Sequence, residues 1–398
     1  MTLSKNAHFP TSSPEKRVGY RIRVLMIGSV GRYSILVACP LSKLCKLTLF
    51  GSEEDRALIK LMTPDPSFSL LTNPLDLKFR SNVLWRVSIG PAISFLIYAV
   101  RILVEKYDIV HVQSCPPYFF LLVPLLRTKR VRIAWTVHDV YLRPSSYGLR
   151  GTLEVFLGRI LFNESYVKRH TDVFFVHGRK LAAFLQGKRV SKTKIVTLNH
   201  PSYPYLRKLC PSKGTKNKPY FLFFGHLRPY KGIPLLLDAV SILRRRFPNI
   251  RLVIAGEGRY DVKAETEKRL LENNVLILKQ FTAEQDIGAL FCDAIAVILP
   301  YQDGSQSGVI PLAYTFGKPV IASRVGSLSE MVDEQKTGFT FDPNNAVELA
   351  RSMSYFLEDE QLSERMRVFC SKKSETSLSP SLIAAKICEA YRQIRETE

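Results

Sequence analysis

The sequence is poor in cysteine, and its seven cysteines are scattered without any CxxC pair. Neither a disulfide framework nor a structural zinc site is expected, and we interpret the thiols as reduced and mostly buried in a cytosolic protein. A secretory signal is also missing, because residues 1–20 are polar and contain no apolar stretch of about 7 to 15 residues. These residues are expected to form a disordered tail on a cytoplasmic chain.

Long hydrophobic runs are absent. The most apolar segment covers residues 83–104, but Arg86 and Arg101 interrupt it, and its uncharged run from Val87 to Val100 has 14 residues. A membrane-spanning helix needs about 20, so this segment is not expected to cross a bilayer. Its helical spacing leaves two alternatives, a helix that faces the core and a helix that lies on a membrane surface. The apolar face would hold Ile93, Leu96, Ile97, Val100 and Val104, and the other face Ser94, Tyr98, Arg101 and Glu105.

Acidic residues are scarce in the first half of the chain. The net charge is +22, and residues 1–200 hold 30 Lys and Arg against 12 Asp and Glu. This half is expected to meet an anionic partner, although a solvated basic face without a partner stays open. No zinc-finger spacing, RNP-like aromatic pattern or Arg/Gly-rich tract supports nucleic acid. We therefore expect peripheral attachment to the anionic cytoplasmic face of a membrane.

With 398 residues, of which 46% are hydrophobic, the chain can form two domains. Short apolar runs alternate with helical patterns, which predicts an α/β protein with two doubly wound, Rossmann-like domains. The first domain is expected at 21–200, a linker at 201–218, the second domain at 219–378, and a terminal helix at 379–398 with the first domain as a candidate packing partner. The expected strands are 24–27, 47–50, 109–113, 132–137, 173–176, 195–198, 220–224, 250–255, 275–278, 294–299 and 319–322. Ligands bind at the carboxyl ends of such strands, so two facing sheets make a cleft for two substrates.

The strongest local motif follows the first strand of the second half. Gly225 permits a tight turn, and Arg228 and Lys231 stand three positions apart just before Gly232 and a predicted helix. Together with a helix N-terminus these two cations can converge on a diphosphate, one as a forked donor and one as a point charge. The alternative is a solvated loop with two chance cations.

Two further motifs also follow strands. Gly256, Glu257 and Gly258 end the next strand and allow close approach of a nucleotide. Residues 300–308 place small residues before a helix that begins at Val309, where free amides can meet an anion or a sugar, although an ordinary helix cap would use the same residues.

Together the three motifs resemble the donor-binding domain of GT-B glycosyltransferases of the retaining family 4 type, over nearly all of residues 220–355. Residues 326–330 and 337–339 are similar to later motifs of that family. The resemblance implies a nucleotide-sugar lying across the second domain, with Arg228 and Lys231 holding its diphosphate. It also implies that these cations, and no metal or other cofactor, neutralise the departing nucleoside diphosphate. The sequence contains no Asp-x-Asp triplet of the metal-binding type.

One departure from the family concerns two glutamates, eight positions apart, that approach the donor sugar and the ribose in most relatives. Gly304 and Leu312 stand at those positions here. Candidate substitutes for the two glutamates are Gln306, Ser307 and the amides of Gly308 and Val309. The identities of the sugar and the nucleotide are left open.

The first half supplies the remaining candidates. Thr136-Val137-His138-Asp139 matches the place where family members put a histidine facing the transferred sugar, and a neutral imidazole there could hydrogen-bond a hydroxyl. A satisfied loop histidine is the alternative. His111 is expected in the core, and residues 199–201 resemble the segment before the family's interdomain joint. The assigned residues are His138, Arg228 and Lys231 as catalytic; Gly28, Gly31, Gly225, Arg228, Lys231, Gly256, Glu257, Gly258, Gln306, Ser307, Gly308 and Val309 as donor-binding; and Arg32 and Asp139 as acceptor-binding.

The resemblance thus implies a retaining, metal-independent transferase that moves a hexosyl unit from a UDP- or GDP-sugar. The basic first half suggests an acceptor linked to a polyprenyl diphosphate or another membrane glycan, as in exopolysaccharide or surface-glycan assembly. Two rivals stay open: a GT-B epimerase or phosphorylase, and a catalytically silent nucleotide-sugar-binding protein docked on a polyanionic surface.

Overall fold

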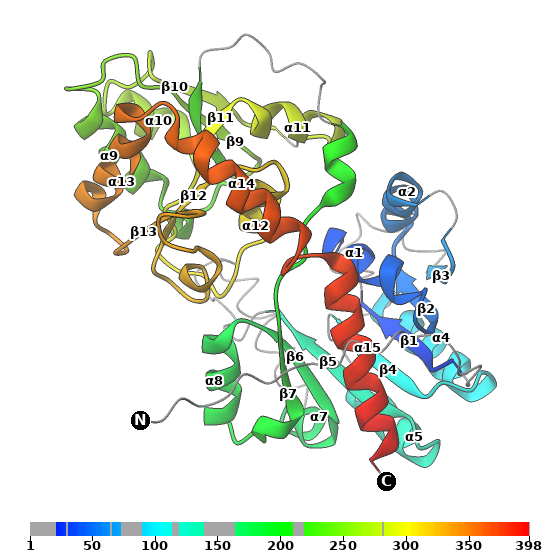
Figure 1. Ribbon diagram of the computed structural model, residues 1–398. Coiled ribbons are helices and arrows are strands. Elements are labelled where there is room, and N and C mark those ends of the chain that lie inside the picture. The colour runs from blue at the N-terminus through cyan, green and yellow to red at the C-terminus, as the bar shows by residue number, and fades with distance from the viewer. Residues whose placement is uncertain are drawn as a thin grey trace.

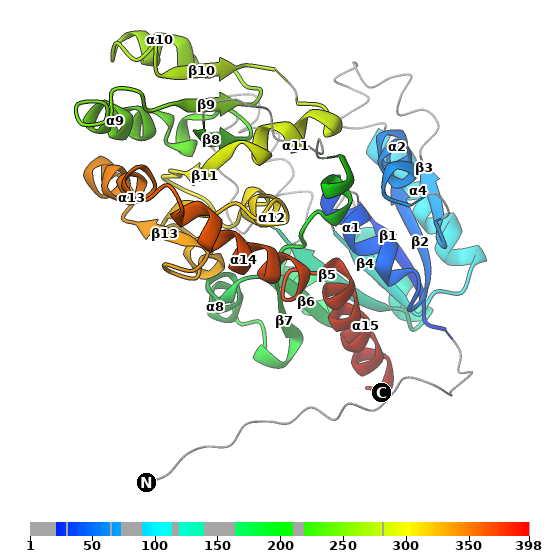
Figure 2. The same cartoon turned by 45° about the horizontal axis from the view of Figure 1, so that its top comes forward.

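The computed structural model describes residues 21–28, 31–63, 66–72, 90–113, 119–138, 164–209, 219–280 and 282–397. Within them the chain forms two parallel β-sheets, each in its own helix-covered domain (Figures 1 and 2). The predicted fold class, two doubly wound Rossmann-like domains, is confirmed. The expected tail at 1–20 lies outside the described residues.

The first sheet has the strand order β3-β2-β1-β4-β5-β6-β7, and all neighbouring strands are parallel. Its central strands are continuous apolar runs because helices bury both faces. Helices α1, α2 and α15 pack on one face, and α4, α5 and α8 pack on the other. The strands are β1 (Arg23–Ile27), β2 (Lys46–Gly51), β3 (Ser69–Thr72), β4 (Ile109–Val112), β5 (Arg132–Val137), β6 (Val173–His177) and β7 (Ile195–Leu198). The helices are α1 (Arg32–Leu41), α2 (Glu53–Met62), α4 (Gly90–Val104), α5 (Phe119–Thr128), α7 (Glu164–His170), α8 (Arg179–Gly187) and η3 (Lys192–Lys194).

The second sheet has the order β10-β9-β8-β11-β12-β13, again parallel throughout. Its strands are β8 (Tyr220–Phe224), β9 (Leu252–Ala255), β10 (Val275–Leu278), β11 (Ala294–Leu299), β12 (Val320–Ser323) and β13 (Gly338–Phe341). The helices are η4 (Pro204–Leu209), η5 (Pro229–Lys231), α9 (Ile233–Leu243), α10 (Val262–Glu267), α11 (Glu284–Cys292), α12 (Val309–Thr315), η6 (Ser329–Met331), α13 (Ala346–Glu358), α14 (Leu362–Glu375) and α15 (Pro380–Glu396).

Two edge strands, β3 and β13, were not predicted. Each has four residues and lies at an end of its sheet. β13 begins at a glycine with φ of 149°, because a Cβ on Gly338 would lie 1.8 Å from the carbonyl oxygen of Val320 on β12. Short edge strands with glycine or polar residues carry little of the apolar pattern that identifies buried strands.

The chain crosses between the domains twice, and the two crossings touch. Ser202 donates its amide to the carbonyl of Leu378 at 2.8 Å and its hydroxyl to the carbonyl of Ser374 at 2.8 Å. The side-chain amide of Asn199 donates to the carbonyl of Ser377 at 3.0 Å. Between Pro201 and the second sheet, η4 packs Tyr205 and Leu206 into the core of the second domain, where the sequence indicated an irregular linker.

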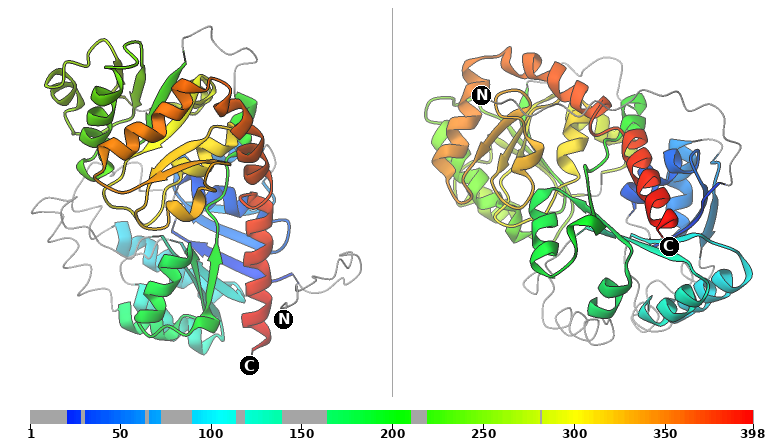
Figure 3. Two further views of the ribbon diagram at one scale, coloured as in Figure 1. Left: turned by 60° about the vertical axis from the view of Figure 1, so that its left-hand side comes forward. Right: turned by 60° about the horizontal axis from the view of Figure 1, so that its bottom comes forward.

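After the second crossing, α15 returns to the first domain and lies along α1 (Figures 1 and 3). Its buried face includes Ile383, Ile387 and Tyr391, which share a core with α1 and β1. The Tyr391 hydroxyl lies 2.6 Å from Nδ1 of His111, and Nε2 of that imidazole lies 2.7 Å from the Thr136 hydroxyl. His111 is therefore a satisfied core residue, as the sequence predicted.

Helix α4 buries Tyr98 and Ile102, whereas Leu96 and Val100 are exposed. The sequence placed Leu96 and Val100 on one face and Tyr98 on another, and the structure keeps this division. The face with Leu96 and Val100 is the exposed one, so the alternative in which it packs against the core is wrong. Tyr98 points inward because its ring packs edge-on against Phe50 of β2, with centroids 4.5 Å apart. Among the described residues no helix is both long and apolar enough to cross a membrane.

Free thiols are present at Cys39, Cys45, Cys370 and Cys388. Cys292, however, is joined in a disulfide whose partner lies outside the described residues. The expectation of reduced thiols throughout is therefore wrong at Cys292, and it no longer supports a cytosolic location.

Candidate functional site

The strongest predicted motif forms the turn from β8 through η5 to α9. Gly225 and Gly232 take positive φ values of 125° and 69°, and a Cβ on Gly232 would lie 1.8 Å from the carbonyl oxygen of Pro300. Only glycine allows this turn to sit against the end of β11. The turn presents the half-buried side chains of Arg228 and Lys231, neither of which forms an ion pair with any described residue.

Arg228 lines a cavity of about 970 Å³ beside the turns that follow β8 and β9. Lys231 lies elsewhere in the same turn, with Nζ 3.6 Å from the centroid of the Tyr301 ring. The cavity is lined by His226, Leu227, Arg228, Pro229, Tyr230, Glu257, Gly258, Arg259, Tyr260 and Gln302. Two unpaired cations on one glycine turn can meet two phosphate groups without first breaking an internal ion pair.

Gly256 and Gly258, which follow β9, also pack closely against the turn after β8. A Cβ on Gly256 would lie 1.9 Å from the carbonyl oxygen of Gly225, and one on Gly258 would lie 2.2 Å from that of Leu227. Close packing of the two turns therefore explains both residues without a ligand. Between them, the Glu257 carboxylate lies 3.4 Å from Nδ1 of His226 and faces the same cavity.

The loop after β11 leads into α12. Ser307 lies 3.3 Å from the Tyr301 hydroxyl and accepts a hydrogen bond from the amide of Val309 at 3.3 Å. Through Tyr301 this loop is joined to Lys231. Gln306 has a buried side-chain oxygen without a partner among the described residues. Leu312 is buried in the core, so the position where relatives carry their second glutamate is apolar here.

In the first domain the predicted His138 directly follows β5 and packs against Tyr33 of α1, with ring centroids 4.6 Å apart. His177 from β6 and His200 from the joint surround the same tyrosine ring at 5.0 and 5.3 Å. Burial lowers the pKa of His138 to about 3 and that of His200 to about 4, and it also lowers the pKa of His177 well below its usual value. All three imidazoles are therefore neutral at pH 7.

This histidine cluster reaches the second domain at α12. His200 stacks on Tyr203, and a Cβ added to Gly308 would lie 2.8 Å from the Tyr203 hydroxyl and 3.3 Å from the His200 ring. Two predicted residues from different domains, His138 and Gly308, are thus connected through a continuous set of packed rings.

Sequence reasoning missed Gln113 and His177. Gln113 follows β4 directly, and both atoms of its buried amide lack a partner among the described residues, as does Nε2 of His138. Buried polar groups are normally paired, so unpaired ones at a strand end indicate a place for a ligand or ordered water. In the sequence, Gln113 could have been recognised as a polar residue directly after a buried apolar run.

Gly28 and Gly31 both precede α1, with φ values of 78° and 54°. Arg32, predicted to bind the acceptor, instead forms an ion pair with Glu284 of α11, and the Tyr205 hydroxyl donates to the same carboxylate at 2.8 Å. Asp139, the other predicted acceptor residue, lies outside the described residues. The roles assigned to individual residues stay predictions.

The domains also meet at the start of α8. The Glu330 carboxylate accepts hydrogen bonds from the amides of Arg179 and Lys180 at 2.7 and 3.1 Å. A Cβ on Gly178 would lie 2.3 Å from the Ser327 hydroxyl oxygen and 2.5 Å from its Cβ. Glycine at 178 is therefore required for this close approach.

Two family models match the chain, one to each domain. The model of glycosyl transferases group 1 matches residues 210–369, and that of glycosyltransferase family 4 matches residues 60–201. Among curated proteins, the chain is 26% identical over 183 residues to an alpha-D-kanosaminyltransferase of Streptomyces kanamyceticus, covering 46% of this chain and 47% of that protein. It is 30% identical over 151 residues to the O-antigen chain mannosyltransferase C of Escherichia coli, covering 37% of this chain and 39% of that protein. The chain thus spans less than half the length of either relative.

Solved structures match over nearly the whole chain. Anabaena Alr3699/HepE in complex with UDP and glucose has a TM-score of 0.68 at 16% identity and covers 93% of this chain and 99% of that one. A putative UDP-N-acetylglucosamine 2-epimerase from Listeria monocytogenes has a TM-score of 0.60 at 14% identity and covers 96% and 98%. At these identities the likeness shows a shared fold.

Proposed function

The chain belongs to the family 4 type of GT-B glycosyltransferases, and from that premise we propose that it transfers a hexosyl unit from a UDP- or GDP-sugar with retention and without a metal. The proposed acceptor is a membrane-associated glycan carried on a polyprenyl diphosphate, in exopolysaccharide or surface-glycan synthesis. The observation that carries the proposal is that Arg228 and Lys231, on the glycine turn after β8, form no ion pair with any described residue.

The diphosphate of the donor is assigned to this turn. The Arg228 guanidinium can donate two parallel hydrogen bonds to one phosphate, and Lys231 supplies a compact charge to the other. As the sugar departs, negative charge grows on the diphosphate oxygen that carried it, and fixed cations stabilise that charge most strongly in the transition state. Two cations already at this place leave no need for a metal ion, so transfer is expected to persist in EDTA.

The sugar is assigned to the histidine cluster and Gln113. Neutral imidazoles and an unpaired amide can hydrogen-bond hydroxyl groups without placing positive charge beside an anomeric carbon that becomes cationic. In the proposed reaction the bond between the anomeric carbon and the diphosphate oxygen breaks. The acceptor oxygen bonds to the same face of that carbon, and its proton passes to the departing diphosphate.

The acceptor proposal rests on the first domain. Residues 1–200 carry an excess of 18 basic side chains, which suits an acceptor bearing a diphosphate on an anionic membrane. The name of the O-antigen mannosyltransferase supports a surface polysaccharide, and the UDP and glucose bound to the Anabaena protein support UDP-glucose as a first donor to try.

A silent binding protein is the second candidate, favoured by one observation. Gly304 and Leu312 occupy the positions of the two family glutamates, and Leu312 is buried in the core. An epimerase or phosphorylase is the third candidate, because the Listeria structure shares the fold.

One experiment separates the three. The chain is incubated with radiolabelled UDP- and GDP-sugars, with membrane lipid extract as acceptor source, and products are resolved by chromatography. Label in a lipid-extractable glycan, with matching release of nucleoside diphosphate, supports transfer. Label in a free epimer or a sugar phosphate supports a rival enzyme. Thermal stabilisation by a nucleotide-sugar without any turnover supports the silent protein.

A further inference from the structure

Helix α4 exposes a stripe of large apolar side chains. Leu96, Val100, Leu103 and Val104 lie on the side opposite to the buried Tyr98 and Ile102, and Leu96 and Val104 are 60% and 77% exposed. Leu121 of the neighbouring helix α5 is 50% exposed as well. An apolar stripe on a helix that faces solvent is unusual for a helix in a globular domain, where the apolar face normally packs inward.

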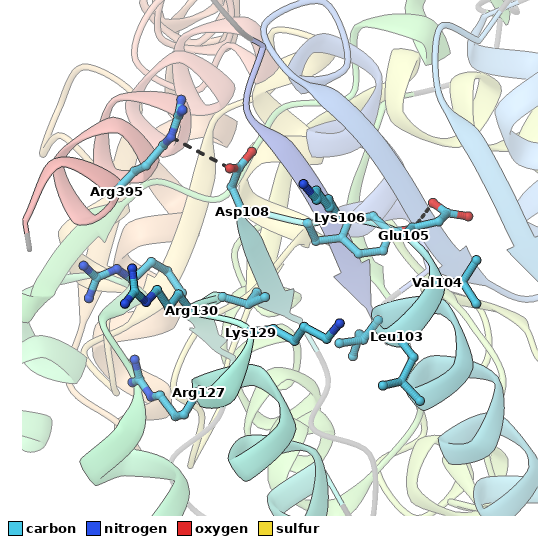
Figure 4. A pocket seen from close by; sticks show the side chains of 13 residues that line it. Leu103, Val104, Glu105, Lys106, Asp108, Arg127, Lys129, Arg130 and Arg395 are labelled. Carbon is cyan, nitrogen blue, oxygen red and sulfur yellow. Dashed lines mark hydrogen bonds and ion pairs between the residues drawn. The ribbon is translucent and has the colours of Figure 1, made fainter.

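Cations stand beside the end of this stripe. A cavity of about 940 Å³ opens between the C-terminal ends of α4, α5 and α15, and Figure 4 shows Leu103 and Val104 at one side of it and basic side chains around the rest. Its lining includes Lys106, Arg127, Lys129, Arg130, Arg132 and Arg395.

The carboxylates nearby are already paired. Glu105 pairs with Arg101, Asp108 with Arg395, and Asp172 with both Arg127 and Arg132. Lys106, Lys129 and Arg130 are exposed and form no ion pair within the described ranges. Three exposed cations without an ion pair to any described residue thus lie next to an apolar stripe, on the surface of the more basic half of the chain.

We propose that this α4 surface, meaning the apolar stripe with Lys106, Lys129 and Arg130, docks the protein on a bilayer that contains anionic lipids. The apolar side chains enter the boundary between headgroups and acyl chains, to a depth of about 5–10 Å for helices of this kind. The cations meet lipid phosphates, and each strengthens binding about fivefold at an anionic surface. The inference deepens the proposed function, on which it rests for the membrane-linked acceptor.

The direction of α4 fits this role. The helix leads from the carboxyl edge of the first sheet, where the candidate site lies, to the amino edge, where β4 begins. Its 15 residues span about 22 Å. A helix lying on the bilayer therefore brings the edge of the sheet that carries the candidate site toward the lipid headgroups, where a diphosphate on a lipid chain is found.

The test uses full-length protein and co-sedimentation with vesicles of phosphatidylcholine, alone or mixed with phosphatidylglycerol. One variant is Leu103→Ser with Val104→Ser, and a second is Lys129→Ala with Arg130→Ala. The matched control is Leu270→Ser with Val347→Ser, a leucine and a valine of the second domain that are 71% and 69% exposed. All four proteins are first compared in melting temperature, which should agree because the changed side chains are exposed.

We expect the unaltered protein to sediment with the mixed vesicles and to be released by high salt. The apolar variant should bind at least tenfold more weakly and the cation variant about 25-fold more weakly, while the control stays within twofold. No sedimentation, equal binding to uncharged vesicles, or unaltered binding by both variants would overturn the inference.

A second readout separates this inference from the proposed function. Thermal stabilisation by UDP reports the second domain alone, and both α4 variants should keep it. Vesicle binding without any donor turnover would refute the enzyme and leave the docking surface standing. Donor turnover without vesicle binding would refute the docking surface and leave the proposed enzyme activity standing.

Discussion

The contact between the start of α8 and residues Ser327 and Glu330 of the second domain depends on Gly178, and Gly178→Ala should disturb it directly. The new methyl group would lie 2.3 Å from the Ser327 hydroxyl oxygen and 2.5 Å from its Cβ. The hydroxyl could rotate away, but the Cβ is fixed by the backbone. The two surfaces must therefore separate by roughly 1 Å to reach an ordinary carbon contact of about 3.5 Å.

Such a separation breaks the two hydrogen bonds that the Glu330 carboxylate accepts from the amides of Arg179 and Lys180. Both are charge-assisted but partly exposed, so about 1 kcal/mol is a fair value for each. Their loss disfavours the closed arrangement by about 2 kcal/mol, or about thirtyfold. Separately, alanine at a φ of 99° strains the first domain by about 1–3 kcal/mol.

The assay is small-angle X-ray scattering, with donor turnover as a companion. Gly178→Ala should increase the radius of gyration and reduce turnover by up to about thirtyfold. Adding Ser327→Gly removes both clashing atoms and should restore the wild-type scattering and turnover, but not the melting temperature, since the strain at 178 persists. Wild-type scattering from Gly178→Ala, or no rescue by Ser327→Gly, would refute this account of the contact.

Three further predictions concern the site and the core. Arg228→Ala and Lys231→Ala should each lower donor turnover about 10²- to 10³-fold in initial-rate assays of nucleoside diphosphate release, because each removes a cation from the departing group; intact turnover would refute the assigned role. The free energy of unfolding should fall as pH drops from about 6.5 toward 4, because burial lowers the pKa of His200 to about 4 and the unfolded chain then binds the proton that the folded chain excludes. Urea unfolding across this range should show a slope to which this histidine contributes up to about 1.4 kcal/mol per pH unit, beside the contributions of His138 and His177. His200→Gln should lower the slope by that amount, and an unchanged slope would contradict a neutral imidazole. Tyr391→Phe should cost about 1–3 kcal/mol of unfolding free energy, because it leaves Nδ1 of buried His111 without its partner; a loss below about 0.5 kcal/mol would contradict the bond.

Much of the fold could be predicted because buried parallel strands are continuous apolar runs. β5, β7 and β11 begin and end where their runs do. β3 could not be predicted in this way, because it is a four-residue edge strand in which no residue is fully buried. For α4 the two faces could be told apart, but residue type alone cannot tell that the face with Tyr98 turns inward while the face with Leu96 and Val100 meets solvent.

The candidate site divides in the same way. Arg228 and Lys231 could be found because the turn that presents them is one contiguous segment. His177 and His200 reach His138 only through the packing of separate strands around Tyr33, and nothing local in the sequence encodes that proximity. The pair of Arg32 and Glu284 joins residues 252 positions apart, which explains why a residue predicted to meet the acceptor meets the other domain.

The paired crossings at Ser202 and Leu378 constrain how the two lobes can swing. A single crossing segment would let one domain twist and tilt freely about the other. Two crossing segments that are hydrogen-bonded to each other restrict both motions. We therefore expect the two domains to move apart mainly by rotation about one axis through both crossing segments. Because η4 packs in the second domain and α15 in the first, we expect such a rotation to separate the domains at the contact between α8 and Glu330.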